Sequence, residues 1–239
     1  NDMYIGRSLI EYGEFSYGEI DLFRQIVTSG SVVVEAGANI GAHTLFLAQQ
    51  TGPTGRVYAI EPQRLAFQAL CGTMALNGIT NAVCLWACAG DQLREAVIPV
   101  LDPNVINNFG GLSIESATIG DRVPILTVDS LQLPSCRLIK ADVEGMEESV
   151  LRGSVETIRR FRPALYLEAD RDDRRASLFR LVDELGYQMY WHRPWLFNPG
   201  NYRGSKVNIF ENIASWNVLA LHKAVKQHIV GLEPITPMG

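Results

Sequence analysis

Residues 32–44 constrain the fold of this chain more than any other segment, because they place a strand directly before a glycine turn and a helix. They read VVVEAGANIGAHT. Three consecutive valines are typical of a strand that is buried on both faces. Gly37 and Gly41 allow the backbone to turn tightly and to approach a ligand closely. The helix that follows offers unpaired N–H groups in its first turn. The segment therefore predicts a binding site for a nucleoside-type ligand.

The rest of the chain alternates short apolar strands with helical patterns. Strands are predicted at 31–36, 57–60, 83–88, 137–141, 164–168, 187–191 and 216–221, and helices at 16–29, 43–50, 63–76, 146–160 and 172–185. Alternation of this kind predicts a doubly wound α/β fold, in which helices cover both faces of a mostly parallel sheet. Two further strands, 96–101 and 123–128, flank a polar loop and predict an inserted β excursion.

A length of 239 residues fits one domain. Within it we expect an N-terminal helical cap over 1–30, an α/β core over 31–222 and a C-terminal tail over 223–239. The content of 47% hydrophobic and 20% charged residues is that of a soluble globular protein. No apolar run reaches the roughly 18–20 residues that span a bilayer, and no signal peptide is visible. A cytoplasmic protein without a membrane partner is expected.

Charge and cysteine content narrow the possible partners. A net charge of −5 argues against a dedicated nucleic-acid binder, which would present a basic face. The cluster of Arg171, Arg174 and Arg175 is interpreted as an ordinary solvated face. The four cysteines show no Cys-x-x-Cys spacing and lie among apolar residues, which predicts buried free thiols in a reducing compartment.

The acids beside the glycine turn indicate which cofactor it binds. A dinucleotide site has the pattern G-x-G-x-x-G, whereas here an acid, Glu35, precedes a G-x-x-x-G turn by two residues. A carboxylate at this place repels a pyrophosphate but attracts an ammonium or sulfonium group. The pattern therefore favours S-adenosylmethionine over NAD. Glu61, at the end of the second strand, is positioned to accept hydrogen bonds from ribose hydroxyls.

A second charged cluster follows the strand at 137–141. If the extended backbone continues, Lys140, Asp142 and Glu144 point to one side of the chain. This strand is expected to lie next to the first one, so the cluster lies near the reactive end of the cofactor. One cation between two carboxylates shifts their proton affinities. The alternative is a helix-capping box with a surface ion pair.

Other residues are weaker candidates. His192 follows a strand end and is either a catalytic base or a plain loop residue. The remaining candidates are Trp191, Trp195 and Tyr202 for stacking on a sugar or for packing, Asp91 for the adenine amino group or a turn, Glu14 and Tyr17 for closing over the cofactor, and residues 108–111 for a lid. No metal is expected, because Asp142 and Glu144 have no histidine or further acid at ligand spacing.

Five segments together resemble the FkbM-type family of S-adenosylmethionine-dependent methyltransferases. They are VEAGANIGAHT at 34–44, AIEP at 59–62, TVDSL at 127–131, KADVEG at 140–145 and RPALYLE at 162–168. The resemblance covers about residues 10–170. It implies a seven-stranded, Rossmann-like methyltransferase sheet, mostly parallel with the last strand reversed. The chain departs from the family at Glu35, where Asp is usual, and at Ala141, where a bulkier aliphatic is usual.

The resemblance and the residue chemistry together lead to one set of expected site residues. The cofactor-binding residues are expected to be Glu35, Gly37, Ala38, Asn39, Gly41, Thr44, Glu61 and Asp142, and the catalytic candidates are Asp142, Glu144, Lys140 and His192. The expected reaction is O-methylation of a small molecule or glycan, and the preference for oxygen comes from the resemblance alone. The acceptor and the oligomeric state stay open.

Two alternatives belong to other classes. One is a methyltransferase-like module that binds a cofactor or a partner without turnover. The other is a nicotinamide-dependent oxidoreductase, which the missing G-x-G-x-x-G pattern and the missing Tyr-x-x-x-Lys pair disfavour. A nucleic-acid methylase is disfavoured too, because the chain has no Asn/Asp-Pro-Pro-aromatic motif.

Overall fold

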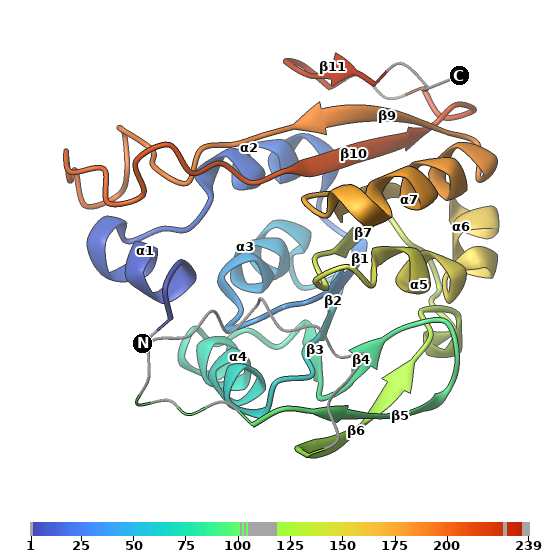
Figure 1. The fold of residues 1–239 in the computed structure, drawn as a ribbon, viewed down its shortest axis with the longest axis horizontal. Helices are drawn as coiled ribbons and strands as arrows, with labels where there is room; N and C mark the ends of the chain where they lie inside the picture. The colour runs from blue at the N-terminus through green and yellow to red at the C-terminus, as the bar shows by residue number, and fades with distance from the viewer. Residues whose placement is uncertain (1, 101, 103, 105–118, 227–228, 236–239) are drawn as a thin grey trace.

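The computed structural model describes residues 2–100, 102, 104, 119–226 and 229–235 (Figure 1). Its main sheet has eight strands in the order β11-β9-β10-β8-β7-β1-β2-β3. These strands are β1 (Val32–Ala36), β2 (Arg56–Ile60), β3 (Ala82–Leu85), β7 (Leu138–Ala141), β8 (Ala164–Glu168), β9 (Tyr187–His192), β10 (Asn217–His222) and β11 (Glu233–Pro234). The α/β fold expected from the sequence is confirmed.

The centre of the sheet is parallel. β1 pairs in parallel with β2 on one side and with β7 on the other. β10 is antiparallel to both of its neighbours, β8 and β9, which confirms the reversed last strand of the core. The eighth strand, β11, was not expected. It adds two residues to the outer edge of β9.

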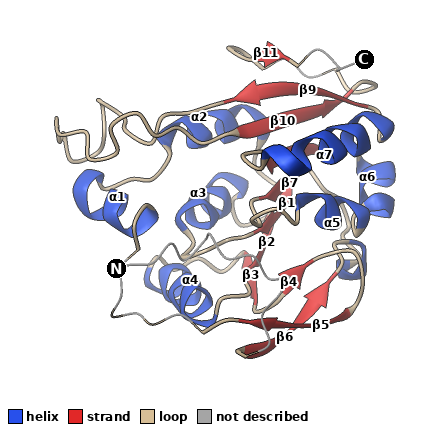
Figure 2. Ribbon diagram, in the orientation of Figure 1, coloured by secondary structure: helices blue, strands red, loops and turns tan. Residues whose placement is uncertain are grey.

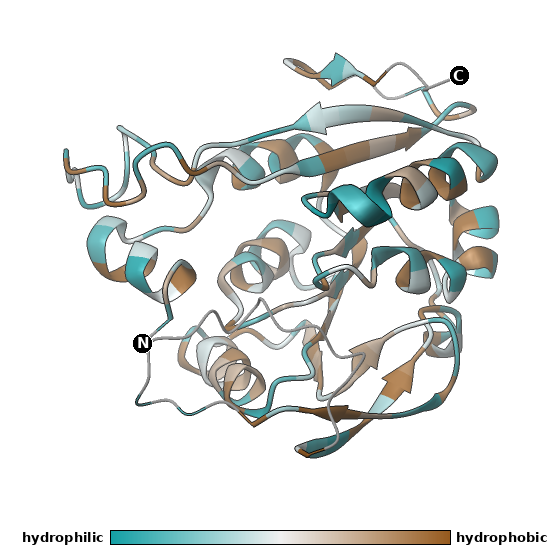
Figure 3. Ribbon diagram, viewed as in Figure 1, coloured by the Kyte–Doolittle hydropathy of each residue, from teal (hydrophilic) through white to brown (hydrophobic). Residues whose placement is uncertain are grey.

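Helices cover both faces of the sheet, as Figure 2 shows. They are α1 (Ile5–Tyr12), α2 (Tyr17–Ile26), α3 (Ala42–Thr51), α4 (Arg64–Leu76), α5 (Glu147–Arg152), α6 (Val155–Phe161) and α7 (Asp172–Glu184). Alternate residues of β1 pack on opposite faces. Val33 joins the apolar cluster of α2 and α3, whereas Val32 and Val34 join that of α5, α6 and α7. The apolar colouring of the central strands in Figure 3 reflects this burial on both faces.

A second, three-stranded sheet is built by the inserted excursion, in the order β4-β6-β5. It contains β4 (Cys88–Ala89), β5 (Arg94–Ile98) and β6 (Asp121–Leu126). The single strand expected at 83–88 is wrong in its extent. The chain leaves the main sheet after Leu85, and Cys88 pairs with Ile125 of β6 instead. The excursion is therefore a sheet of its own.

The helix expected at 146–160 is two helices. The break lies at Gly153, where a Cβ atom would stand 1.9 Å from the carbonyl oxygen of Gly90. Only glycine permits this backbone contact. The second helix, α6, starts beside Asp129, whose carboxylate accepts hydrogen bonds from the N–H groups of Glu156 and Thr157.

The N-terminal helices pack against the segment between β9 and β10. Tyr12 of α1 lies in one apolar cluster with Leu196 and Phe210. The Glu14 carboxylate accepts hydrogen bonds from the Asn198 side chain and from the Tyr202 N–H group. Two segments far apart in the sequence thus form one unit beside the sheet. Among the described residues, no helix is long and apolar enough to cross a membrane.

Candidate active site

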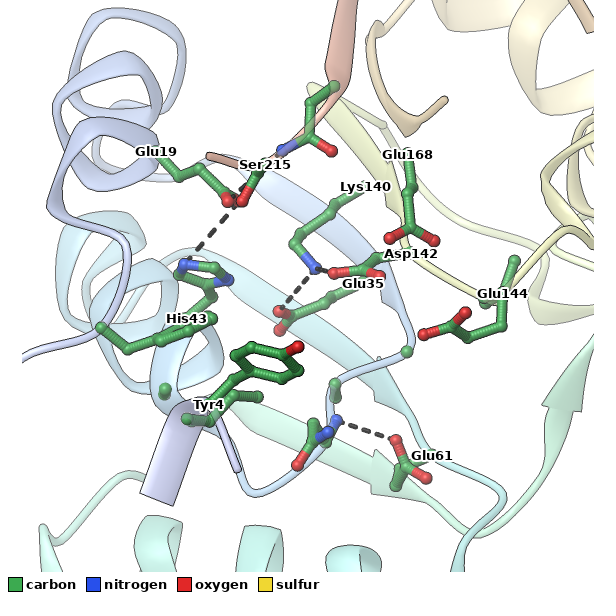
Figure 4. Close-up of a pocket in the computed structure, with 18 of the residues that line it drawn as sticks. Tyr4, Glu19, Glu35, His43, Glu61, Lys140, Asp142, Glu144, Glu168 and Ser215 are labelled. Atoms are coloured by element: carbon green, nitrogen blue, oxygen red, sulfur yellow. Dashed lines mark hydrogen bonds and ion pairs between the residues drawn. The ribbon is translucent and has the colours of Figure 1, made fainter. Parts of the chain in front are cut away.

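A cavity of about 380 Å³ opens where the central parallel strands end. The ends of β1, β2, β7 and β8 line it, together with the N-terminal helices and the segment before β10 (Figure 4). We call it the cofactor cavity, after the ligand that the sequence leads us to expect there. Its lining contains eight acids, which are Asp2, Glu19, Glu35, Glu61, Asp142, Glu144, Glu168 and Asp170. Lys140 is the one lysine among the described lining residues, and no arginine is among them. This charge distribution favours a cationic ligand.

The glycine turn after β1 forms one wall of the cavity. Gly37 has φ +81° and Asn39 has φ +49°, so the chain reverses in a left-handed conformation. A Cβ atom at Gly37 would stand 1.8 Å from the carbonyl oxygen of Asp142, so only glycine allows the turn to rest on the end of β7. Ala38 and Asn39 line the cavity. Gly41 lies behind them and begins α3, packed against Leu70.

Glu61 is held at the end of β2 by backbone donors. Its two carboxylate oxygens accept hydrogen bonds of 2.8 Å from the N–H groups of Asn39 and Gln63. Burial raises the pKa of Glu61 to about 7, although these hydrogen bonds lower it. A carboxylate oxygen can accept two hydrogen bonds and each oxygen of Glu61 accepts one here, so Glu61 can still accept hydrogen bonds from a ligand.

The buried ion pairs differ from those expected. Lys140 lies opposite Glu35 in the register of β7 and β1, and their side chains share one face of the sheet. The Lys140 Nζ atom is 3.8 Å from Glu35 Oε1 and 3.1 Å from Asp142 Oδ2. The expected grouping holds for Lys140 and Asp142, and it is wrong for Glu144. The strand ends at Ala141, and Glu144 has φ +55° in a turn.

Glu144 instead pairs with an arginine of the neighbouring helix. Its carboxylate is 2.7 Å from the Arg171 guanidinium, which lies just before α7. Burial raises the pKa of Glu144, and the hydrogen bond from Arg171 lowers it in part. Glu144 still lines the cofactor cavity, but its charge is compensated by Arg171.

Lys140 is a fully buried ammonium group. Burial lowers its pKa, but the carboxylates of Asp142, Glu35 and Glu19 outweigh burial and raise it above the ordinary value. Burial also raises the pKa of Glu35 to about 7, against the attraction of Lys140. Thr44 donates a 2.6 Å hydrogen bond to Glu35, so its role here is to hold that carboxylate rather than to line the cavity.

The sequence analysis missed several residues of the site, among them Glu19 of α2, His43 of α3 and Glu168 of β8. Glu19 Oε2 lies 3.8 Å from His43 Nε2. Burial raises the pKa of Glu19 to about 7 and lowers the pKa of His43 well below its ordinary value. A signal for Glu19 was present, because it shares the helix face of Phe23 and Ile26 at spacings of four and seven residues.

His192 belongs to a buried hydrogen-bond chain rather than to the cavity wall. Its Nδ1 atom is 2.8 Å from the Tyr166 hydroxyl, which also accepts a 2.8 Å hydrogen bond from Asn217. Asn217 also donates to Glu19 at 3.3 Å. Burial lowers the pKa of His192 to about 4. Among the described residues that line the cofactor cavity, His192 is not present.

Glu168 stands at the end of β8 and lines the cavity. Its Oε2 atom is buried and has no hydrogen-bond partner among the residues that the structure describes. Burial, with the charges of Asp142, Glu144 and other acids nearby, raises its pKa well above the ordinary value. Within the described part of the chain, Glu168 therefore presents a buried carboxyl oxygen in the cavity wall that no protein group bonds.

The weaker candidates lie mostly away from the cofactor cavity. Trp191 packs edge-on against Phe179 and Trp216, whereas the side chains of Trp195 and Tyr202 are largely exposed. Glu14 accepts a hydrogen bond from Asn198 in the segment before β10, and Tyr17 accepts one from Arg24. Asp91 lines a different cavity. The lid expected at 108–111 lies outside the described residues. Within the described part of the chain, no group of three His, Cys, Asp or Glu side chains is arranged to hold a metal ion.

Comparison with known proteins identifies the family. The model of the methyltransferase FkbM domain matches residues 35–189. The chain belongs to the FkbM methyltransferase family. This match confirms the resemblance seen in the sequence, and it places the glycine turn, Glu61 and the 140–145 segment inside the family domain.

Solved methyltransferases share the fold. Methyltransferase FkbM from Methylobacillus flagellatus has 20% identity and a TM-score of 0.55 over 80% of this chain, which spans 44% of that protein. Precorrin-6y C5,15-methyltransferase from Geobacter metallireducens has 12% identity and a TM-score of 0.53, covering 85% of this chain and 87% of its own. SMU.1697c from Streptococcus mutans, in complex with SAH, has 13% identity and a TM-score of 0.51, covering 85% and 94%. No curated protein sequence matches the chain.

Proposed function

We propose that this FkbM-family protein uses S-adenosylmethionine to methylate a hydroxyl oxygen of a small molecule or glycan. The observation that carries the proposal is the acid-lined cavity at the strand ends, where the glycine turn, Glu61 and Asp142 meet. The preference for oxygen comes from the family resemblance. Membership of a methyltransferase family supports the proposal, since the fold alone does not specify a function.

The residues present fit S-adenosylmethionine. This cofactor supplies an electrophilic methyl group on a positively charged sulfur. A cavity with eight acids and one lysine suits that charge and disfavours the pyrophosphate of NAD. The backbone of Ala38 and Asn39 would lie against the nucleoside, and Glu61 would accept hydrogen bonds from the ribose hydroxyls.

Asp142 is the proposed proton acceptor for the acceptor hydroxyl. Its side chain is 45% exposed, lines the cofactor cavity and is positioned by the ion pair with Lys140. The Lys140 ammonium group also pairs with Glu35, and the Glu35 carboxylate accepts a hydrogen bond from the Thr44 hydroxyl. The buried residues would thus orient one accessible carboxylate, and positioning is the main contribution that a protein makes to a displacement at carbon.

Calorimetry with S-adenosylhomocysteine tests the cofactor assignment. The wild-type protein is expected to bind it, and Glu61→Ala is expected to weaken binding by at least about tenfold, because a charge-assisted ribose contact is lost. Glu95→Ala is the matched control, since the Glu95 side chain is 67% exposed and lies outside the cavity lining. Absence of binding at millimolar ligand, or binding of NAD instead, would overturn the assignment.

Turnover separates the enzyme from a non-catalytic module. Transfer of a labelled methyl group from S-adenosylmethionine to a library of hydroxyl compounds is expected for the wild type. Asp142→Asn should retain S-adenosylhomocysteine binding and lose transfer. Transfer at the wild-type rate by Asp142→Asn would remove the proposed role of Asp142.

A further inference from the structure

A second cavity, of about 350 Å³, lies beside the cofactor cavity. Five arginines line it, which are Arg94 of β5, Arg152 of α5 and Arg171, Arg174 and Arg175 at the N-terminal end of α7. We call it the arginine cavity. The sequence pattern suggested that the last three form a solvated face. In the fold they surround one hollow together with two arginines from other elements.

Two of the four acids that line the arginine cavity already accept hydrogen bonds from the protein. Glu148 is 2.6 Å from the Arg152 guanidinium. Glu147 accepts hydrogen bonds from the N–H groups of Val143 and Gly145, and burial raises its pKa to about 7. Five arginines thus face four acids in the lining. Three of these arginines also pair with acids outside it, Arg171 with Glu144, Arg174 with Asp173 and Arg175 with Asp172.

Two of the arginines, Arg94 and Arg171, retain N–H donors that no described residue is seen to use. Arg94 makes no side-chain hydrogen bond or ion pair with any residue that the structure describes. Arg171 donates one N–H group to Glu144, and a guanidinium carries five. Several planar donor groups that converge on one hollow are suited to an anion with two or three oxygens, such as phosphate, sulfate or carboxylate.

Two acids, each with a buried oxygen that lacks a described partner, point to a ligand in the same place. Glu168 lines both cavities, and its Oε2 atom has no hydrogen-bond partner among the described residues. Asp91 lines the arginine cavity, and its Oδ1 atom is equally without a described partner. Buried polar atoms are rarely left unpaired, so a ligand with hydroxyl groups would complete both. Met146 also lines both cavities, which makes them adjacent.

We propose that the arginine cavity binds an anionic group of the methyl acceptor, and that the acceptor passes Glu168 to bring a hydroxyl into the cofactor cavity. The acceptor class is then a hydroxylated anion, such as a phosphorylated, sulfated or carboxylated sugar. This inference rests on the proposed methyl transfer, because it assigns the second cavity to the same substrate.

The test is calorimetry at low ionic strength with inorganic phosphate, sulfate and acetate as separate probes. At least one anion is expected to bind the wild-type protein, and the one that binds identifies the charged group. Arg94→Glu should weaken that binding by at least about fivefold, because a charge-assisted contact becomes a repulsion. Arg159→Glu is the matched control. It changes the net charge equally on a side chain that is 71% exposed and outside the cavity.

Each outcome decides between the two proposals. Absence of binding by all three anions, or equal loss in Arg94→Glu and Arg159→Glu, overturns the anion site. If S-adenosylhomocysteine binds in the same preparation, the proposed function stands without it. Anion binding without S-adenosylhomocysteine binding overturns the proposed function, and the acceptor role of the cavity with it. Arg94 has no described partner to lose, so its substitution does not put the fold at risk.

Discussion

At the scale of single residues, the site depends on a lysine that water does not reach. Lys140 is 1% exposed, and its ammonium group lies between Glu35 and Asp142. An ammonium group in a protein interior costs several kcal/mol unless carboxylates and hydrogen bonds compensate it. Removing the lysine leaves Glu35 buried without its counter-charge. Removing the charges of both Lys140 and Glu35 leaves no unpaired charge between these two residues and changes only their packing.

The first prediction follows from this asymmetry. Lys140→Met should lower the free energy of unfolding by about 3–5 kcal/mol, because one partner of a buried pair is left behind. The double variant Lys140→Met/Glu35→Gln should recover most of the loss. Urea denaturation at pH 7.5 measures both. Lys223→Met is the control, since its 2.7 Å ion pair with Asp183 is half-exposed, and an exposed pair contributes about 1 kcal/mol or less.

A loss for Lys140→Met no larger than that for Lys223→Met would show that the buried pairs do not stabilise the fold. A double variant as unstable as the single one would show that Glu35 is not the partner that matters.

At the scale of elements, the β1–α3 turn is packed on the end of β7 with no side chain between them. Gly37 makes this possible, because a Cβ atom there would stand 1.8 Å from the Asp142 carbonyl oxygen. The same contact brings the glycine turn next to Asp142, the proposed catalytic carboxylate. Gly37 is thus needed for the backbone contact between the β1–α3 turn and the end of β7, in addition to any close approach of a ligand.

Gly37→Ala should therefore lower the free energy of unfolding by about 3 kcal/mol or more, through backbone overlap and a strained φ of +81°. Gly72→Ala offers a contrast inside one chain. Gly72 lies in α4 with nothing within 4 Å of the added Cβ, so alanine should stabilise by about 0.5–1 kcal/mol. Thermal unfolding of both variants makes the comparison, and a Gly37→Ala protein as stable as the wild type would refute the backbone contact.

At the scale of the whole molecule, the fold buries several glutamate side chains near the C-terminal ends of the central strands. Glu19, Glu35 and Glu61 each have a pKa of about 7 in the folded protein, against 4.5 as the ordinary value, mainly because of burial. The folded state then holds protons that the unfolded state has released. Stability from these groups is complete below pH 4.5 and is lost as pH rises through 7.

We expect the free energy of unfolding to fall by about 1–2 kcal/mol between pH 6.5 and pH 8. The buried histidines act in the opposite direction only at lower pH, because the pKa of His192 is lowered to about 4 from an ordinary 6.5. Urea titrations at several pH values measure the slope. Glu61→Gln should reduce it, since the amide cannot release a proton. Constant or rising stability over this interval would contradict the burial of ionisable carboxyls.

Much of the site was visible in the sequence because it is local. The valine run, the glycine turn and the acids at 35 and 61 lie within single strand–turn–helix units, where periodicity and turn chemistry decide the conformation. The structure places Ala38, Asn39, Glu61 and Asp142 around one cavity, and their role in binding a cofactor stays a prediction. Helix boundaries failed where a contact was distant, as at Gly153, which touches Gly90.

The chain alone determined the order of strands and helices and the acids beside the glycine turn, because these follow from short-range pattern, whereas the reversed strand was implied only by the family resemblance. Only the tertiary structure decided that Lys140 faces Glu35 rather than Glu144, that Glu19 reaches the site from α2, and that five arginines share one hollow. The physical reason is register. The packing of the whole core decides which residues meet across strands and helices. The free energy of that packing depends on residues far apart in the sequence, so a local pattern does not predict it.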